Sequence, residues 1–155
     1  MRLCLPILVL LLVACRPAGQ PTAASSVDRA SLTRHLSAQL DRAAGDWNRG
    51  DLDAFMSDYA AESTTTYVDG RRARHGFDFI RNNYAPRFAT GARRDSLHFE
   101  EVEVRPLSPT LALVTARFIL QRGDSTTASG PFTLVMEQRS EGWKILHDHS
   151  SSDPR

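Results

Sequence analysis

The sequence predicts an α+β domain in which a cone-shaped, curved antiparallel sheet wraps around three N-terminal helices. Two observations lead to this prediction. The first half of the chain repeats apolar residues at spacings of three and four, which is typical of helices. The second half alternates apolar and polar residues, which is typical of strands. Helices followed by a long meander form a domain whose helices cover one face of the sheet.

Three helices are predicted in the first half. The first carries an apolar stripe made of Leu32, Leu36, Leu40, Ala43 and Trp47. Gly50 suits the left-handed residue that ends this helix, and Asp51 suits the N-cap of a short second helix. A third helix should begin near Gly76, and Pro86 should end or kink it near Tyr84.

The predicted strands follow the helices, except for a short threonine-rich one at residues 63–68 that ends in an Asp69-Gly70 turn. A basic loop is expected at residues 71–74. Four longer strands are predicted at residues 97–107, 111–121, 126–138 and 143–150, and their short connections indicate antiparallel hairpins. In the first of these four, the apolar alternation changes phase near Glu100-Glu101, which predicts a β-bulge there.

The N-terminus has the pattern of an export signal. Arg2 precedes an apolar run that is too short to span a bilayer and ends in Leu12-Val13-Ala14-Cys15. This ending resembles the lipobox of bacterial lipoproteins, in which the cysteine is lipidated and becomes the first residue. The alternative is an ordinary signal peptide with an incidental cysteine. The residue after the cysteine is Arg16 and not an aspartate. In Gram-negative bacteria this resembles lipoproteins that are passed on to the outer membrane.

These patterns divide the chain into three parts: a signal peptide at residues 1–14, a lipidated cysteine with a flexible tether at 15–30, and a folded domain at 31–152. An extracytoplasmic protein anchored to a bacterial membrane is therefore expected. Cys4 lies in the signal, so no disulfide is expected in the mature domain. The 19 basic and 18 acidic residues of the full chain form no block of like charge, which argues against nucleic-acid binding.

Several short segments resemble the SnoaL-like group of the nuclear transport factor 2-like superfamily, to which ketosteroid isomerase and scytalone dehydratase belong. The segments are residues 130–135, 142–151, 47–55 and the turn at 67–70. They are also similar to the association domain of calcium/calmodulin-dependent protein kinase II. The resemblance extends from about Ser31 to Ser152. It implies a conical sheet with a pocket at its open end, and a homodimer formed through the outer face of the sheet.

The last predicted strand offers two candidate pocket residues. A strict alternation places Trp143, Ile145, His147 and His149 on one face, which we predict to be the inner one. Two inward histidines would be natural polar groups of a pocket and could exchange protons near neutral pH. Alternatively, both are structural and bond to backbone or to a partner subunit. As a metal pair they would lack further ligands, so no metal site is expected.

Four other candidates complete the predicted pocket. Arg117 shares its parity with Leu113 and Ile119 and could clamp an anion, although the opposite face of that strand is more apolar and would instead turn Arg117 outward. Tyr59, Tyr67 and Tyr84 lie on elements that should line the pocket, where their rings are core material by default.

The sequence leaves three functions open. The first is a binding module for a small organic molecule, and the second is an isomerase or dehydratase that uses acid–base chemistry. The third is an accessory lipoprotein with a vestigial pocket. No carboxylate is predicted to face inward, so the catalytic groups of ketosteroid isomerase are not carried over. Nucleophile and phosphate-binding motifs are absent from the sequence, and no cofactor is expected.

Overall fold

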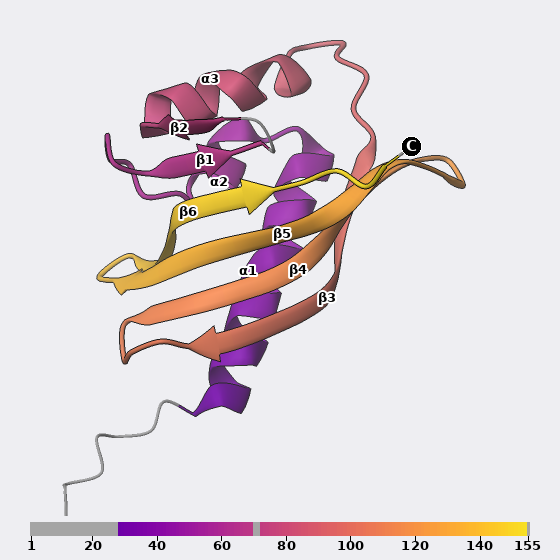
Figure 1. The fold of residues 1–155 in the computed structure, drawn as a ribbon. Coiled ribbons are helices and arrows are strands. Elements are labelled where there is room, and N and C mark those ends of the chain that lie inside the picture. The colour runs from indigo at the N-terminus through magenta and orange to yellow at the C-terminus, as the bar shows by residue number, and fades with distance from the viewer. Residues whose placement is uncertain (1–27, 70–71, 155) are drawn as a thin grey trace, which may run out of the picture.

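The computed structural model describes residues 28–69 and 72–154. The first helix, α1, runs from Arg29 to Arg49 (Figure 1). The carboxylate of Asp28 caps it by accepting a hydrogen bond from the Ala30 amide at 3.1 Å. Gly50 ends it in the left-handed conformation, with a φ of 80°. The helix therefore ends as predicted, and it begins two residues before residue 31, where the folded domain is predicted to begin.

Two shorter helices follow in the order that the sequence predicts. α2 spans Leu52–Met56 and begins where Asp51 accepts a hydrogen bond from the Ala54 amide at 3.0 Å. α3 spans Phe77–Phe88 and continues past Pro86, so the predicted end of the helix near Tyr84 is wrong. The proline removes one helical hydrogen bond close to the helix end. Packing holds the last turn, because the Phe88 ring lies 5.2 Å from that of Trp47.

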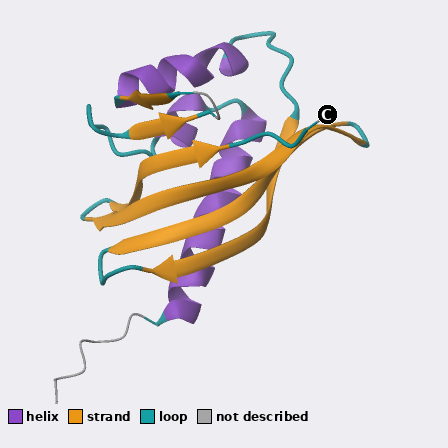
Figure 2. Cartoon of the chain, viewed as in Figure 1, coloured by secondary structure: helices purple, strands orange, loops and turns teal. Residues whose placement is uncertain are grey.

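Six strands form one sheet in the order β2-β1-β6-β5-β4-β3 (Figure 2). β1 is Thr66–Val68 and β2 is Ala73–His75. β3 is Ser96–Pro106, β4 is Leu111–Arg122, β5 is Ser125–Arg139 and β6 is Gly142–Ser150. The four long strands are joined as the predicted antiparallel hairpins.

The β1–β2 edge differs from the prediction. Residues 73–75 form a strand rather than part of a loop, and the first strand begins at Thr66 rather than at 63. β2 lies at the edge of the sheet and is not fully buried at any position, so it carries no apolar alternation that would reveal it. β1 pairs in parallel with β6, a contact between segments that are far apart in the sequence.

The core lies between α1 and one face of the sheet (Figure 1). Leu36 of α1 is fully buried, as are Val114 and Met136 of the facing strands. The Asn48 side chain exchanges two hydrogen bonds with the Leu97 backbone, at 2.7 and 2.9 Å, and fixes the end of α1 on β3. The register of β3 shifts between Glu100 and Glu103, and Glu101 has a φ of 54°, which confirms the predicted bulge.

Residues 1–27 lie outside the described part of the chain, and with them the predicted signal peptide, Cys15 and most of the tether. None of the helices between Arg29 and Phe88 is both long and apolar enough to cross a membrane.

Candidate functional site

A cavity of about 360 Å³ opens between the helices and the concave face of the sheet. Its walls are mostly apolar. Trp47 of α1, Phe55 of α2 and Tyr84 of α3 form one side, and the sheet contributes a second group made of Leu97, Phe99, Phe118, Leu120, Phe132, Leu134 and Met136. A volume of a few hundred cubic ångströms with a mainly apolar lining is typical of sites for small organic molecules.

One acidic side chain, Asp148 of β6, enters this apolar cavity. In the sheet it stands beside Leu134 of β5, which in turn stands beside Val114 of β4, and both of these residues are buried in the core. Since residues paired across a sheet share a face, Asp148 points inward. Only 4% of its surface is exposed.

Two hydroxyl groups hold the carboxylate of Asp148. Tyr59 donates a hydrogen bond to Oδ2 at 2.6 Å, and Ser150 donates one to Oδ1 at 2.9 Å. Burial raises the pKa of Asp148 above its ordinary value, although the two hydrogen bonds and the nearby charges of His147 and His149 act in the opposite direction. Asp148 is therefore a group that can hold a proton within an apolar site.

Tyrosine hydroxyls gather around Asp148. The Tyr84 hydroxyl lies 3.5 Å from that of Tyr59, and the ring of Tyr67 is centred 5.9 Å from the ring of Tyr84. Burial, followed by the charge of Asp148, raises the pKa of both Tyr59 and Tyr84 well above the ordinary value. The tyrosines stay protonated and can donate hydrogen bonds. The structure thus places Tyr59, Tyr67 and Tyr84 in the lining of the cavity.

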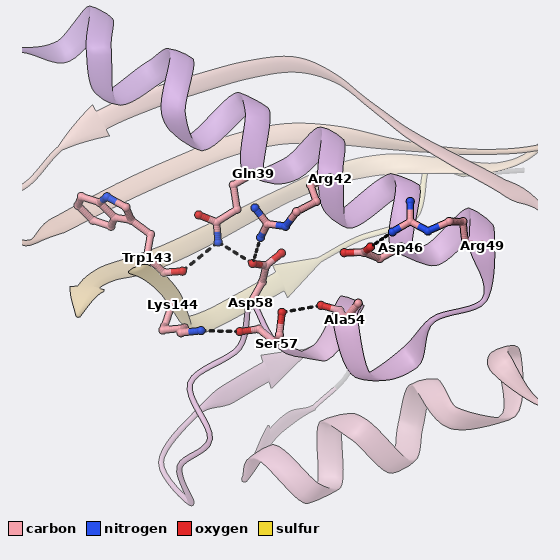
Figure 3. Close-up of polar contacts among 9 residues, drawn as sticks. All are labelled: Gln39, Arg42, Asp46, Arg49, Ala54, Ser57, Asp58, Trp143 and Lys144. Carbon is pink, nitrogen blue, oxygen red and sulfur yellow. Dashed lines mark hydrogen bonds and ion pairs between the residues drawn. The ribbon is translucent and has the colours of Figure 1, made fainter. Parts of the chain in front are cut away.

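A second buried carboxylate, Asp58, follows α2 (Figure 3), and it also lines the cavity. Its Oδ1 accepts a hydrogen bond from Gln39 Nε2 at 2.9 Å and forms an ion pair with Arg42. The same Gln39 nitrogen donates to the Trp143 carbonyl at 2.9 Å, and the Asp58 carbonyl accepts from the Ile145 amide at 2.7 Å. These bonds tie α1 and β6 to the segment that carries Tyr59.

The other oxygen of Asp58, Oδ2, is buried and has no hydrogen-bond partner within residues 28–69 and 72–154. Burial raises the pKa of Asp58, while Arg42 and Gln39 lower it less. Since the bonded oxygen is directed at α1 (Figure 3) and the backbone carbonyl bonds to β6, we assign Asp58 to positioning the neighbouring Tyr59.

The predicted inward orientation of His147 and His149 is wrong. The register of β5 and β6 shifts between Val135 and Met136, so that Ile145 and His147 oppose adjacent residues and Leu146 is an extra residue. This bulge reverses the alternation. Ile145 stays buried, but His147 pairs with Val135 on the outer face and His149 is exposed; neither lines the cavity.

Arg117 also lies outside the cavity, so the anion-clamp interpretation is wrong, and the alternative of an outward side chain holds. It forms an ion pair with Asp153 in the C-terminal segment, and the same carboxylate accepts a hydrogen bond from Ser129 at 2.6 Å. The more apolar face of β4 turns inward, as its burial pattern shows. Arg117 therefore fastens the C-terminal segment, whose Ser151 and Ser152 form part of the cavity wall.

Gly130 allows that segment to lie close to β5. A Cβ atom at position 130 would overlap the carbonyl oxygen of Ser151. We expect Gly130→Ala to displace the C-terminal segment and to lower the free energy of unfolding by about 1–3 kcal/mol, as overpacked substitutions do. The amides of Ser151 and Asp153, which now donate to Pro131 and Ser129 at 3.0 and 2.8 Å, should exchange hydrogen faster.

Urea unfolding and amide exchange measured by NMR check this expectation. Ser129→Ala is the matched control, because it removes one hydroxyl hydrogen bond and leaves the backbone contact in place. Unchanged protection of Ser151 in Gly130→Ala would show that the segment is not held by close contact with β5.

Sequence reasoning missed Asp148, Asp58 and Gln39. A regular alternation along β6 assigns Asp148 to the outer face, and the bulge that reverses it lies between two apolar residues, Ile145 and Leu146, which give no phase signal. Gln39 and Asp58 meet only through the tertiary fold. Among residues 28–69 and 72–154, no group of three or more His, Cys, Asp or Glu side chains is arranged to hold a metal ion.

Comparison with known proteins places this architecture among characterised folds. A family model described as a SnoaL-like domain matches residues 36–154. No curated protein matches the chain. An NTF-2 like protein of unknown function from Shewanella oneidensis MR-1 is 29% identical with a TM-score of 0.66, and the match covers 79% of this chain and 98% of that chain.

Two further solved structures share the fold at lower identity. A proposed dehydratase from the NTF2-like family of Streptomyces avermitilis is 19% identical with a TM-score of 0.64, covering 84% of this chain and 100% of that chain. A protein of unknown function with a cystatin-like fold from Nostoc punctiforme is 14% identical with a TM-score of 0.64, and the match covers 80% of this chain and 91% of that chain. The predicted fold class is confirmed.

Proposed function

Because the chain belongs to the SnoaL-like domain family, we propose that its cavity binds a small, largely apolar organic molecule that carries a hydroxyl or carbonyl group. The observation that carries this proposal is the burial of Asp148, with its tyrosine partners, in a cavity of about 360 Å³ whose lining residues are mainly apolar. An open cavity with converging polar groups favours binding over a vestigial pocket, which side chains would fill.

A ligand hydroxyl would donate a hydrogen bond to Asp148, and a ligand hydroxyl or carbonyl oxygen would accept one from Tyr84. Both hydrogen bonds of Asp148 that the structure contains come from Tyr59 and Ser150, and each carboxylate oxygen can accept more than one. The Tyr84 hydroxyl lies 3.5 Å from that of Tyr59 and also interacts with that of Tyr67, and a hydroxyl can rotate to donate to a ligand instead. The apolar body would contact rings of the sheet on the same face as Asp148, such as Phe118 and Phe132.

Two matched probes test this proposal. We expect 2-naphthol to bind the purified full-length chain at least about tenfold more tightly than naphthalene, since a hydrogen bond to a charged group contributes about 1.5–3 kcal/mol. NMR titration would localise the shifts to cavity residues. Ala128→Phe, which fills the cavity, should abolish binding, and Thr126→Phe on the same strand, outside the cavity, should not.

Equal affinity for the two probes would contradict the role of Asp148. Binding that persists in Ala128→Phe would place the ligand elsewhere.

Acid–base catalysis of the isomerase or dehydratase type is the second candidate. It is favoured by the raised pKa of Asp148, which burial produces, and by the neighbouring Tyr84, which can donate to a developing oxyanion. Replacing Asp148 by Asn distinguishes binding from catalysis, because an amide accepts a hydrogen bond but does not exchange a proton.

Location and assembly extend the proposal. The protein is anchored outside the cytoplasm through Cys15, in the outer membrane if the host is Gram-negative; the support is the sequence pattern of residues 1–16 alone. It forms a homodimer through the outer face of the sheet. Half-buried apolar side chains on that face, Leu113 and Val135 beside His147, support a partner surface there.

A further inference from the structure

An arginine lies at the opening of the cavity. The exposed lining residues, Asp69, Asn83, Arg87 and Ser152, form its rim. Asn83 and Arg87 are one turn apart on α3, so their side chains lie on the same side of the helix. The guanidinium carbon of Arg87 is 5.9 Å from the centre of the Tyr84 ring, which places its charge next to the tyrosines around Asp148.

Arg87 differs from the arginines that build the fold. Arg42, Arg117 and Arg139, for example, each form an ion pair with a carboxylate. Within residues 28–69 and 72–154, no carboxylate lies within ion-pair distance of Arg87. Its backbone carbonyl accepts a hydrogen bond from Arg94 at 3.0 Å, which steadies the end of α3. The guanidinium is thus left to face the opening.

The charge of Arg87 reaches the polar part of the cavity. It lowers the pKa of Tyr67, against the larger effect of burial, which raises it. A guanidinium offers its N–H groups in a planar fork that matches a carboxylate, and an adjacent amide such as Asn83 can supply another donor.

We propose that the ligand of this cavity is a small organic carboxylate, whose acidic group pairs with Arg87 and Asn83 at the rim while its apolar body fills the cavity. This inference rests on the proposed function and narrows its ligand class. Asp69 is on the same rim and repels an anion, so the carboxylate would lie on the α3 side of the opening.

Binding of 2-naphthylacetate and 2-naphthylacetamide by the full-length chain tests the inference, because the two probes differ in charge but hardly in size. Isothermal titration calorimetry should show the carboxylate binding about five- to tenfold more tightly at low salt, the range expected of a partly exposed, charge-assisted pair. Added NaCl should weaken the binding of 2-naphthylacetate and leave the affinity for 2-naphthylacetamide unchanged.

Three variants complete the test. Arg87→Gln should remove the preference for the carboxylate while keeping the amide affinity. Arg81→Gln, on the same helix but outside the cavity, should keep the preference. Asp69→Asn should increase the preference for the carboxylate, because it removes a negative charge from the rim.

Equal affinity for the two probes in the wild-type chain, or a preference that survives Arg87→Gln, would overturn the assignment of Arg87 and leave the proposed binding function intact. Failure of both probes to bind would overturn both proposals.

Discussion

Replacing Trp47 by Ala is expected to lower the free energy of unfolding by about 3–5 kcal/mol, the range for a large aromatic side chain removed from a core. Trp47 is 5% exposed and packs edge-on against Phe55 and Phe88, with ring centres 5.6 and 5.2 Å away. Its indole nitrogen donates to the Asp95 carbonyl at 2.9 Å. The substitution therefore leaves both a void and an unpaired acceptor.

Urea unfolding measures the change, and Leu36→Ala is the matched control. Leu36 is fully buried on the same helix but does not line the cavity. Both variants should be destabilised. Only Trp47→Ala should change the affinity for 2-naphthol, because Trp47 lines the cavity and Leu36 does not. If Trp47→Ala lowers the free energy of unfolding by less than about 1 kcal/mol, the packing described for α1, α2 and α3 is contradicted.

Asp148→Asn is expected to raise the free energy of unfolding at pH 7.5 by roughly 1–3 kcal/mol, since it removes a buried charge and keeps the acceptor for Tyr59. The pKa of Asp148 is higher in the folded chain than in the unfolded chain. Protonation therefore stabilises the fold, fully below the unfolded pKa of about 3.9, and this stabilisation is lost as the pH rises through the folded pKa.

The difference in stability between Asp148→Asn and wild type should therefore be largest near neutral pH and shrink as the pH falls. Using the difference cancels the other groups, including Asp58, whose pKa is also raised, and Asp95, whose pKa is lowered by Thr127 and Arg122. Asp69→Asn, the same substitution at an exposed position of the cavity lining, is the matched control. A difference that does not vary between pH 4 and pH 7.5 would mean that Asp148 has an ordinary pKa.

The same variant separates the two candidate functions. If Asp148 exchanges protons with a ligand, wild type should accelerate the exchange of the α-protons of 2-tetralone in deuterated water, as followed by NMR, and Asp148→Asn should not. Both proteins should bind 2-tetralone, because an amide still bonds a ketone through its N–H group. Exchange at the uncatalysed rate in wild type would favour a binding module.

Patterns among consecutive residues were enough to predict most of the architecture. Periodicities of 3.6 and 2 are local properties, so α1, α2 and the four long antiparallel strands could be predicted from consecutive residues. Even the β3 bulge was visible, since Leu97 and Phe99 are out of phase with Val102 and Val104. The three cavity tyrosines were predicted because they belong to elements whose place in the fold the resemblance implied.

The polar side chains that face the cavity, in contrast, depend on how the strands pair in the folded chain. In β6 the extra residue is Leu146, and its position depends on pairing with β5 and on burial of Ile145, not on any change in the local pattern. That single bulge exchanges His147 and His149 for Asp148. The contacts of Gln39 with Asp58 and of β1 with β6 likewise join segments that are distant in the chain, and such contacts leave no periodic signal for sequence analysis to detect.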